Sequence, residues 1–247
     1  MKILLLRSFR TFPVLCLLTL ICGVLTAAPI VAHTEKTAAV KSGMTLKGKV
    51  IAVDAGHGGA DPGAVGVTGS VEKDINLLLV KELSSLLEEK GAVPILTRTD
   101  DGVYSNVKRE ELDYRAALVK KADAELFLSL QCNSTPNSEL HGAQTFYYPE
   151  SEQGKLLAES IQNRFRRILA NTDREALTLS SAYIMSKLDI PAVMVEVGFL
   201  SNPEEEALLN DEEYRKKVVT AVYCGILDYY KARATAPSWL RDIIEMW

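Results

Sequence analysis

Short apolar runs alternate along the chain with longer stretches in which apolar residues recur every three or four positions. The runs are rich in branched side chains and predict strands, whereas the periodic stretches predict amphipathic helices. We expect strands over residues 50–53, 93–97, 125–130, 143–148 and 192–197. We expect helices from an N-cap at Ser70 to Gly91 and over residues 108–121, 154–169, 203–209 and 211–230. This order favours one α/β domain with a mostly parallel, wound sheet and helices on both faces.

Residues 1–32 have the pattern of an export segment. Three basic residues come first, and no charged residue follows between 11 and 32. Thr26-Ala-Ala28 matches the small-x-small pattern of a cleaved signal peptide, whereas the uncharged length approaches the roughly 20 residues of a membrane anchor. The sequence leaves both open. In either case we expect the rest of the chain outside the inner membrane, with membrane contact through this segment if it is uncleaved.

The remaining chain divides by composition into a tether over 33–48, a catalytic domain over 49–232 and a tail over 233–247. The 247 residues, 47% of them apolar, can bury one full core. A net charge of -4 gives no basic patch for nucleic acid, so we exclude that partner. Outside the leader only Cys132 and Cys224 remain, which is too few for a disulfide scaffold. We expect Cys224 to lie in the core.

A glycine-rich turn, residues 53–63, follows the first expected strand and contains His57. Its glycines permit backbone conformations and close approaches that other residues resist. A phosphate-binding loop is a weak alternative, because the spacing of neither common glycine motif is present. A plain turn with an exposed histidine stays open at this point.

Several polar residues follow other strands at the same expected edge of the sheet. Glu72 begins the first helix, Gln131 and Asn133 follow the third strand, and Glu196 lies near the end of the last strand. The carboxyl ends of parallel strands are neighbours, so these side chains and His57 should converge. A carboxylate inside an apolar strand is costly unless it is paired, bound to a metal or used as an acid or base. Locally, Glu72 is also explained by the positive end of its helix.

Other charged residues have simpler interpretations. Arg98 and Arg115 could bind substrate carboxylates, but arginines in helices and loops more often form surface ion pairs. Residues 204–206, three glutamates after Pro203, fit the solvated first turn of a helix.

Three motifs together resemble the zinc-dependent N-acetylmuramoyl-L-alanine amidases. They are the glycine-rich turn 53–63, Glu72-Lys-Asp74 and Val195–Asn202, and the similarity spans residues 49–230. Residues 142–148 and 171–174 are most similar to the germination-specific amidases of spore formers. The resemblance implies hydrolysis of the amide between N-acetylmuramic acid and L-alanine in peptidoglycan. It further implies a role in making muramic lactam in the spore cortex, within the forespore envelope, with functional coupling to a polysaccharide deacetylase.

The resemblance also implies roles for individual residues. His57 and Glu72 match two ligands of one zinc ion, and Glu196 matches the catalytic glutamate. From their positions after the third strand, we expect Asn133 and His141 to contact the substrate.

The third ligand of the family is a histidine, but this chain has Gln131 there. An amide oxygen is a poorer zinc ligand than an imidazole nitrogen. Gln131 could bind weakly through its oxygen, Cys132 could turn inward, or His141 could reach the metal. Cys132 should point away from Gln131 if the strand continues that far. The alternative to an enzyme is a peptidoglycan-binding or regulatory homologue that has lost hydrolysis.

Overall fold

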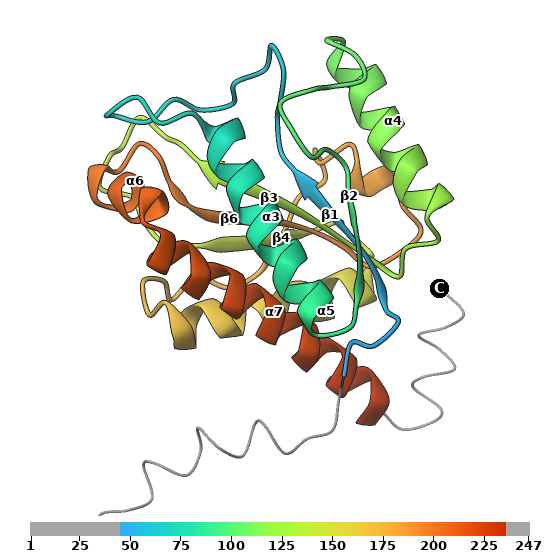
Figure 1. The fold of residues 1–247 in the computed structure, drawn as a ribbon. Helices are drawn as coiled ribbons and strands as arrows, with labels where there is room; N and C mark the ends of the chain where they lie inside the picture. The colour runs from blue at the N-terminus through green and yellow to red at the C-terminus, as the bar shows by residue number, and fades with distance from the viewer. Residues whose placement is uncertain (1–44, 236–247) are drawn as a thin grey trace, which may run out of the picture. The chain divides into compact units, whose positions relative to one another are not determined.

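The computed structural model describes residues 45–235. The expected export segment and most of the tether, and the tail from residue 236 onward, lie outside this range. The six strands form one sheet in the order β2-β1-β3-β6-β4-β5 (Figure 1). Their bounds are β1 Val50–Ala55, β2 Val93–Leu96, β3 Leu126–Asn133, β4 Gln144–Tyr147, β5 Leu177–Thr178 and β6 Ala192–Phe199.

The strands β2, β1, β3 and β6 run parallel to one another. The strand β4 pairs with β6 in the antiparallel direction, and the short β5 lies parallel to β4 at the edge. The predicted mostly parallel sheet is therefore confirmed. Because the carboxyl ends of β1, β3 and β6 are adjacent, the loops after them share one edge of the sheet.

Helices cover both faces of the sheet, as predicted. The helix bounds are α3 Glu72–Glu89, α4 Lys108–Lys121, α5 Glu152–Ile168, α6 Pro203–Asn210 and α7 Glu212–Thr235, with a 3₁₀ helix, η1, at Met185–Lys187. The helices α3, α5 and α7 lie on one face, and α4 lies on the other (Figure 1). Among residues 45–235, none of the helices has the length and hydropathy that crossing a membrane requires.

Alternation along the central strands separates an apolar face from a polar one. Val53, Leu128 and Val195 point into the large core beneath α3, α5 and α7. The neighbouring positions on the α4 side include the polar side chains of Asp54 and Glu196. The α4 face therefore becomes polar toward the carboxyl ends of the strands, where the site lies.

The start of α3 differs from the prediction. The N-cap is Val71, which makes no side-chain capping bond, so the assignment of Ser70 as the cap is wrong. The backbone N–H of Ser70 donates instead to Glu206 Oε1 at 3.1 Å.

The ordered fold extends beyond the expected domain limits at both ends. Leu46, in the expected tether, is fully buried in the core, and α7 continues to Thr235. Cys132 is buried and Cys224 is only half-buried, and both are free thiols. The expectation that Cys224 lies in the core was therefore wrong.

The first turn of α6 is also different from the prediction. Glu204 is exposed, but Glu205 and Glu206 are buried, so the interpretation of all three as solvated is wrong. The carboxylate of Glu205 accepts the N–H groups of Gly142 at 2.9 Å and Phe199 at 2.8 Å. These loop amides need an acceptor away from water, and the helix supplies it.

Glu206 ties a second loop to α6. Its carboxylate accepts from the backbone N–H groups of Thr68 and Ser70 and from the Thr68 hydroxyl. The loop so held, residues 64–71, leads directly into Glu72, the first residue of α3. The two buried glutamates of α6 therefore hold three backbone segments, at Gly142, at Phe199 and in the loop before α3.

Candidate active site

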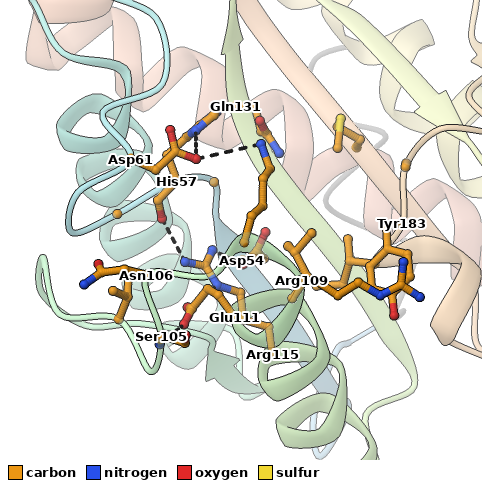
Figure 2. A pocket seen from close by; sticks show the side chains of 18 of the residues that line it. Asp54, His57, Asp61, Ser105, Asn106, Arg109, Glu111, Arg115, Gln131 and Tyr183 are labelled. Carbon is orange, nitrogen blue, oxygen red and sulfur yellow. Dashed lines mark hydrogen bonds and ion pairs between the residues drawn. The ribbon is translucent and has the colours of Figure 1, made fainter.

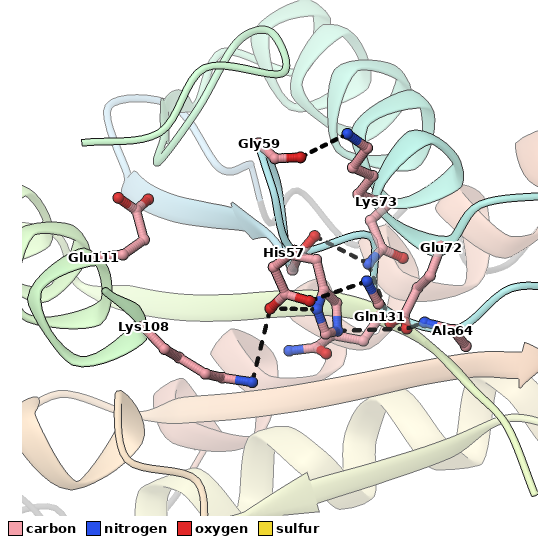
Figure 3. Close-up of polar contacts among 12 residues, drawn as sticks. His57, Gly59, Ala64, Glu72, Lys73, Lys108, Glu111 and Gln131 are labelled. Atoms are coloured by element: carbon pink, nitrogen blue, oxygen red, sulfur yellow. Dashed lines mark hydrogen bonds and ion pairs between the residues drawn. The ribbon is translucent and has the colours of Figure 1, made fainter. Parts of the chain in front are cut away.

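The histidine side of the site consists of His57, Asp61 and Glu72. His57 has a positive φ of 64°, which is uncommon for a residue other than glycine and is concentrated at functional sites. Its Nε2 lies 3.4 Å from Glu72 Oε2, and its Nδ1 lies 3.0 Å from Asp61 Oδ2 (Figures 2 and 3). The imidazole is therefore held between two carboxylates.

The charges on this side reinforce one another. Burial works to lower the pKa of His57, but the adjacent carboxylates of Glu72 and Asp61 outweigh it and raise the pKa. Burial works to raise the pKa of Glu72, but His57 and two backbone N–H groups, those of Ala64 and Cys132, lower it overall. Glu72 is thus a buried, ionised carboxylate, and the prediction of a mere helix-end charge does not account for these contacts.

Gly63 explains why the turn must contain glycine at this point. Its φ is 68°, and a Cβ added there would lie 2.5 Å from Glu72 Oε2 and 2.8 Å from His57 Cδ2. Any side chain at residue 63 would push the two functional groups apart.

The strand side of the site consists of Gln131 and Glu196. They occupy paired positions on β3 and β6, so their side chains leave the same face of the sheet. The amide of Gln131 lies beside His57 (Figure 3), and its Nε2 donates to Ser129 Oγ at 3.1 Å. A Cβ on Gly56 would lie 2.6 Å from Gln131 Cδ, so a side chain there would displace the Gln131 amide.

Glu196 has an unsatisfied carboxylate oxygen. Its Oε2 is buried and has no hydrogen-bond partner among residues 45–235. Burial and the negative charge of Glu72 raise the pKa of Glu196 to about 7, although His57 works to lower it. A carboxyl group with a proton affinity near neutrality suits general acid–base chemistry.

Cys132 points to the opposite face of β3, as predicted, and belongs to the apolar core. Burial and the nearby carboxylates raise the pKa of its thiol well above the usual value. Its thiol is therefore not available to replace a ligand at Gln131.

Arg115 connects the strand side of the site to α4. Its buried guanidinium donates to Asp54 Oδ1 at 2.9 Å, to Glu111 Oε1 at 2.8 Å and to the carbonyl oxygen of His57 at 2.8 Å. Asp54 Oδ2 accepts from Ser129 Oγ, which accepts in turn from Gln131. A hydrogen-bonded chain thus holds Gln131 in place.

Arg98 holds the glycine-rich turn itself. It donates to the carbonyl oxygens of Ala55, Gly56 and Lys73. Both Arg98 and Arg115 are buried, so the prediction of surface pairs was wrong for each.

A pocket of about 500 Å³ opens on the α4 side of the sheet beside His57 and Gln131 (Figure 2). Its walls come from the turn after β1, the start of α4 and the segment before η1. The predicted substrate residues lie elsewhere: Asn133 is half-buried, His141 is exposed, and neither lines the pocket.

The donor set partly fits a zinc ion. The contact between Nδ1 of His57 and Asp61 leaves Nε2 as the nitrogen that would bind a metal, next to the carboxylate of Glu72. In residues 45–235, however, no group of three His, Cys, Asp or Glu side chains is arranged to hold a metal. The residues present therefore supply two common zinc ligands and one neutral amide, that of Gln131.

Sequence reasoning missed Asp61 and the chain through Asp54 and Arg115. The sequence could have indicated Asp61, because it lies four residues after His57 in the same glycine-rich turn. For Arg115 the local sequence indicates only the Glu111 pair four residues earlier on α4, because its other partners, Asp54 and the carbonyl oxygen of His57, are distant in sequence.

The fold and site define an α/β protein with a histidine and two glutamates clustered at the carboxyl ends of parallel strands. The chain belongs to the N-acetylmuramoyl-L-alanine amidase family, whose model matches residues 51–228. It is 39% identical over 202 residues to the germination-specific N-acetylmuramoyl-L-alanine amidase of Bacillus subtilis. The matched region covers 78% of this chain and 85% of that relative.

Solved structures give the same assignment. The CwlD amidase of Clostridioides difficile, determined in complex with the GerS lipoprotein, has a TM-score of 0.72 and 36% identity, over 74% of this chain and 99% of that one. The catalytic domain of CwlV from Bacillus (Paenibacillus) polymyxa has a TM-score of 0.67 and 32% identity, over 74% and 98%. The resemblance, the fold and the peptidoglycan amidase class predicted from sequence are thereby confirmed.

Proposed function

We propose that this amidase removes stem peptides from N-acetylmuramic acid in the spore cortex, with Glu196 as its general base. The unpaired, buried Oε2 of Glu196 beside His57 and Glu72 carries the proposal for the site. The similarity to the germination-specific relative supports the cortex as the substrate.

We further propose that one zinc ion is held by His57 Nε2 and Glu72, with the amide oxygen of Gln131 as a weak third ligand. When bound, the ion supplies the Lewis acidity that lowers the pKa of water and stabilises an oxyanion. Asp61 orients the imidazole from its other nitrogen. The chain from Arg115 through Asp54 and Ser129 keeps the Gln131 amide from rotating away.

The remaining chemistry belongs to Glu196. It accepts a proton from the water that attacks the carbonyl carbon of the lactyl–alanine amide, and it returns this proton to the amine of L-alanine as that bond breaks. A muramic acid without its stem peptide is then available for a polysaccharide deacetylase, which would be a functional rather than a bound partner. The export segment, residues 1–32, would place this reaction outside the cytoplasm as a signal peptide or an anchor.

The test is digestion of spore-cortex peptidoglycan in water enriched in ¹⁸O. Mass spectrometry should find stem peptides that begin with a free L-alanine amine, and ¹⁸O in the lactyl carboxylate of muramic acid. Label at another bond would contradict the amidase assignment. Binding to peptidoglycan without any product would instead support the regulatory homologue.

A further inference from the structure

The end of the pocket farther from His57 contains Arg109 and Tyr183 (Figure 2). The Cζ atom of Arg109 lies 4.3 Å from the centre of the Tyr183 ring, a cation–π arrangement. The Tyr183 hydroxyl donates to Asp113 Oδ1 at 2.6 Å. The ring is therefore fixed to α4, and it positions the guanidinium at the pocket wall.

Arg109 differs from the other cationic side chains of the pocket because it has no carboxylate partner within residues 45–235. Arg115 is paired with Asp54 and Glu111, and Lys108 lies 3.8 Å from Asp61. Within residues 45–235, no carboxylate oxygen lies within 4.0 Å of the Arg109 guanidinium. Its positive charge is thus free to pair with a ligand.

We propose that Arg109, packed on Tyr183, binds a free carboxylate of the stem peptide and sets a preference for anionic over amidated stems. This inference rests on the amidase function. The pocket begins beside His57 and Gln131, where the scissile amide would lie, so a peptide extending from that amide along the pocket reaches Arg109. A guanidinium recognises a carboxylate through two parallel hydrogen bonds, and a neutral sugar offers no such partner.

The probes are the γ-methylamides of N-acetylmuramoyl-L-alanyl-D-glutamate and N-acetylmuramoyl-L-alanyl-D-isoglutamine, so the first has one free carboxylate, at the α position, and the second has an amide there and no free carboxylate. The full-length wild-type protein should show a lower KM for the acid. Arg109→Gln should raise KM for the acid by about 10-fold, as expected when a hydrogen bond to a charged group is lost, and should leave kcat unchanged. Arg109→Lys should keep part of the preference.

Two further variants separate recognition from structure. Lys155→Gln removes the same charge from an exposed position of α5 and should change neither KM. Tyr183→Leu should weaken the preference for the acid, because it removes the ring under the guanidinium.

An NMR titration with both probes tests the same preference without turnover, if a chelator has first removed metal from the protein. A failure of hydrolysis is then distinguishable from a failure of this inference. Tighter binding of the acid by wild type, lost in Arg109→Gln, supports it. Equal affinity of the wild type for both probes, or an unchanged preference in Arg109→Gln, overturns it.

Discussion

The histidine side and the strand side of the site differ in how their polar groups are paired. On the histidine side, both ring nitrogens of His57 contact carboxylates, and Glu72 accepts two backbone N–H groups. On the strand side, Gln131 offers a neutral amide, and one oxygen of Glu196 has no hydrogen-bond partner within residues 45–235. Among residues 45–235, His57 Nδ1 also lacks a hydrogen bond, because its contact with Asp61 is an ion pair without hydrogen-bond geometry. The difference between the two sides is therefore that backbone N–H groups fix the Glu72 carboxylate, whereas water or substrate can use the free oxygen of Glu196.

This difference assigns separate tasks to the two sides. Zinc affinity should depend on the histidine side, and proton transfer should depend on the strand side. The position where both tasks meet is Gln131, because it adjoins His57 and shares a face with Glu196.

The largest effect is expected from Glu196→Gln. This variant should lose roughly 10²- to 10⁴-fold in kcat, the range for general acid–base groups, while zinc binding and the melting temperature stay the same. Muropeptide release and calorimetry measure these quantities. Glu159→Gln, exposed on α5, is the matched control. Retained turnover in Glu196→Gln would remove it as the base.

The next effect sharpens the contrast between the two sides. Gln131→His should raise both zinc affinity and activity, because it adds a third zinc ligand. A residue that only hydrogen-bonds to a zinc ligand contributes roughly 10- to 100-fold to affinity, so the gain from a new ligand should be larger. Gln131→Leu, which lacks an oxygen, should weaken zinc binding. Competition with a chelator measures both affinities. If Gln131→His changes neither quantity, the third-ligand position is assigned wrongly.

Asp61→Asn probes the histidine side from outside the ligand pair. The loss of the charged partner of Nδ1 should weaken zinc binding by about 10- to 100-fold. Asp173→Asn, at an exposed position far along the chain, should leave affinity unchanged. Equal zinc affinities in these two variants would show that Asp61 does not support His57.

The smallest effect concerns stability. Glu206→Gln places an amide where the N–H groups of Thr68 and Ser70 donate, so it should lower the free energy of unfolding by roughly 1–3 kcal/mol. Glu204→Gln, two residues earlier and exposed, should stay within about 0.5 kcal/mol of wild type. Urea unfolding measures both, and equal stabilities would contradict a structural role of Glu206.

Much of the fold could be predicted because its pattern is local. The helix expected over residues 108–121 has those bounds in the structure, and the parallel sheet follows from the alternation of strands and helices. The prediction of Ser70 as the N-cap failed although serine is a common capping residue. Its backbone N–H donates instead to Glu206, a partner that is distant in sequence. The sequence alone does not reveal that competition.

The site was predictable where residues follow strands and obscure where contacts cross the sheet. His57, Glu72, Gln131 and Glu196 lie together because parallel strands end at one edge. The burial of Arg115 depends on Asp54 of β1 as well as on Glu111 of its own helix, and the Asp54 contact joins residues 61 positions apart. No local pattern distinguishes such an arginine from an exposed one.

The most direct test of zinc binding at His57 and Glu72 is the release of stem peptides by the full-length protein as a function of free zinc. Protein stripped of metal by a chelator should be inactive, and added zinc should restore activity along a saturable curve. In Gln131→His this curve should shift to lower zinc concentration. Full activity of the stripped wild-type protein, or no activity at any zinc concentration, would contradict the claim that the amidase depends on a zinc ion bound by His57 and Glu72.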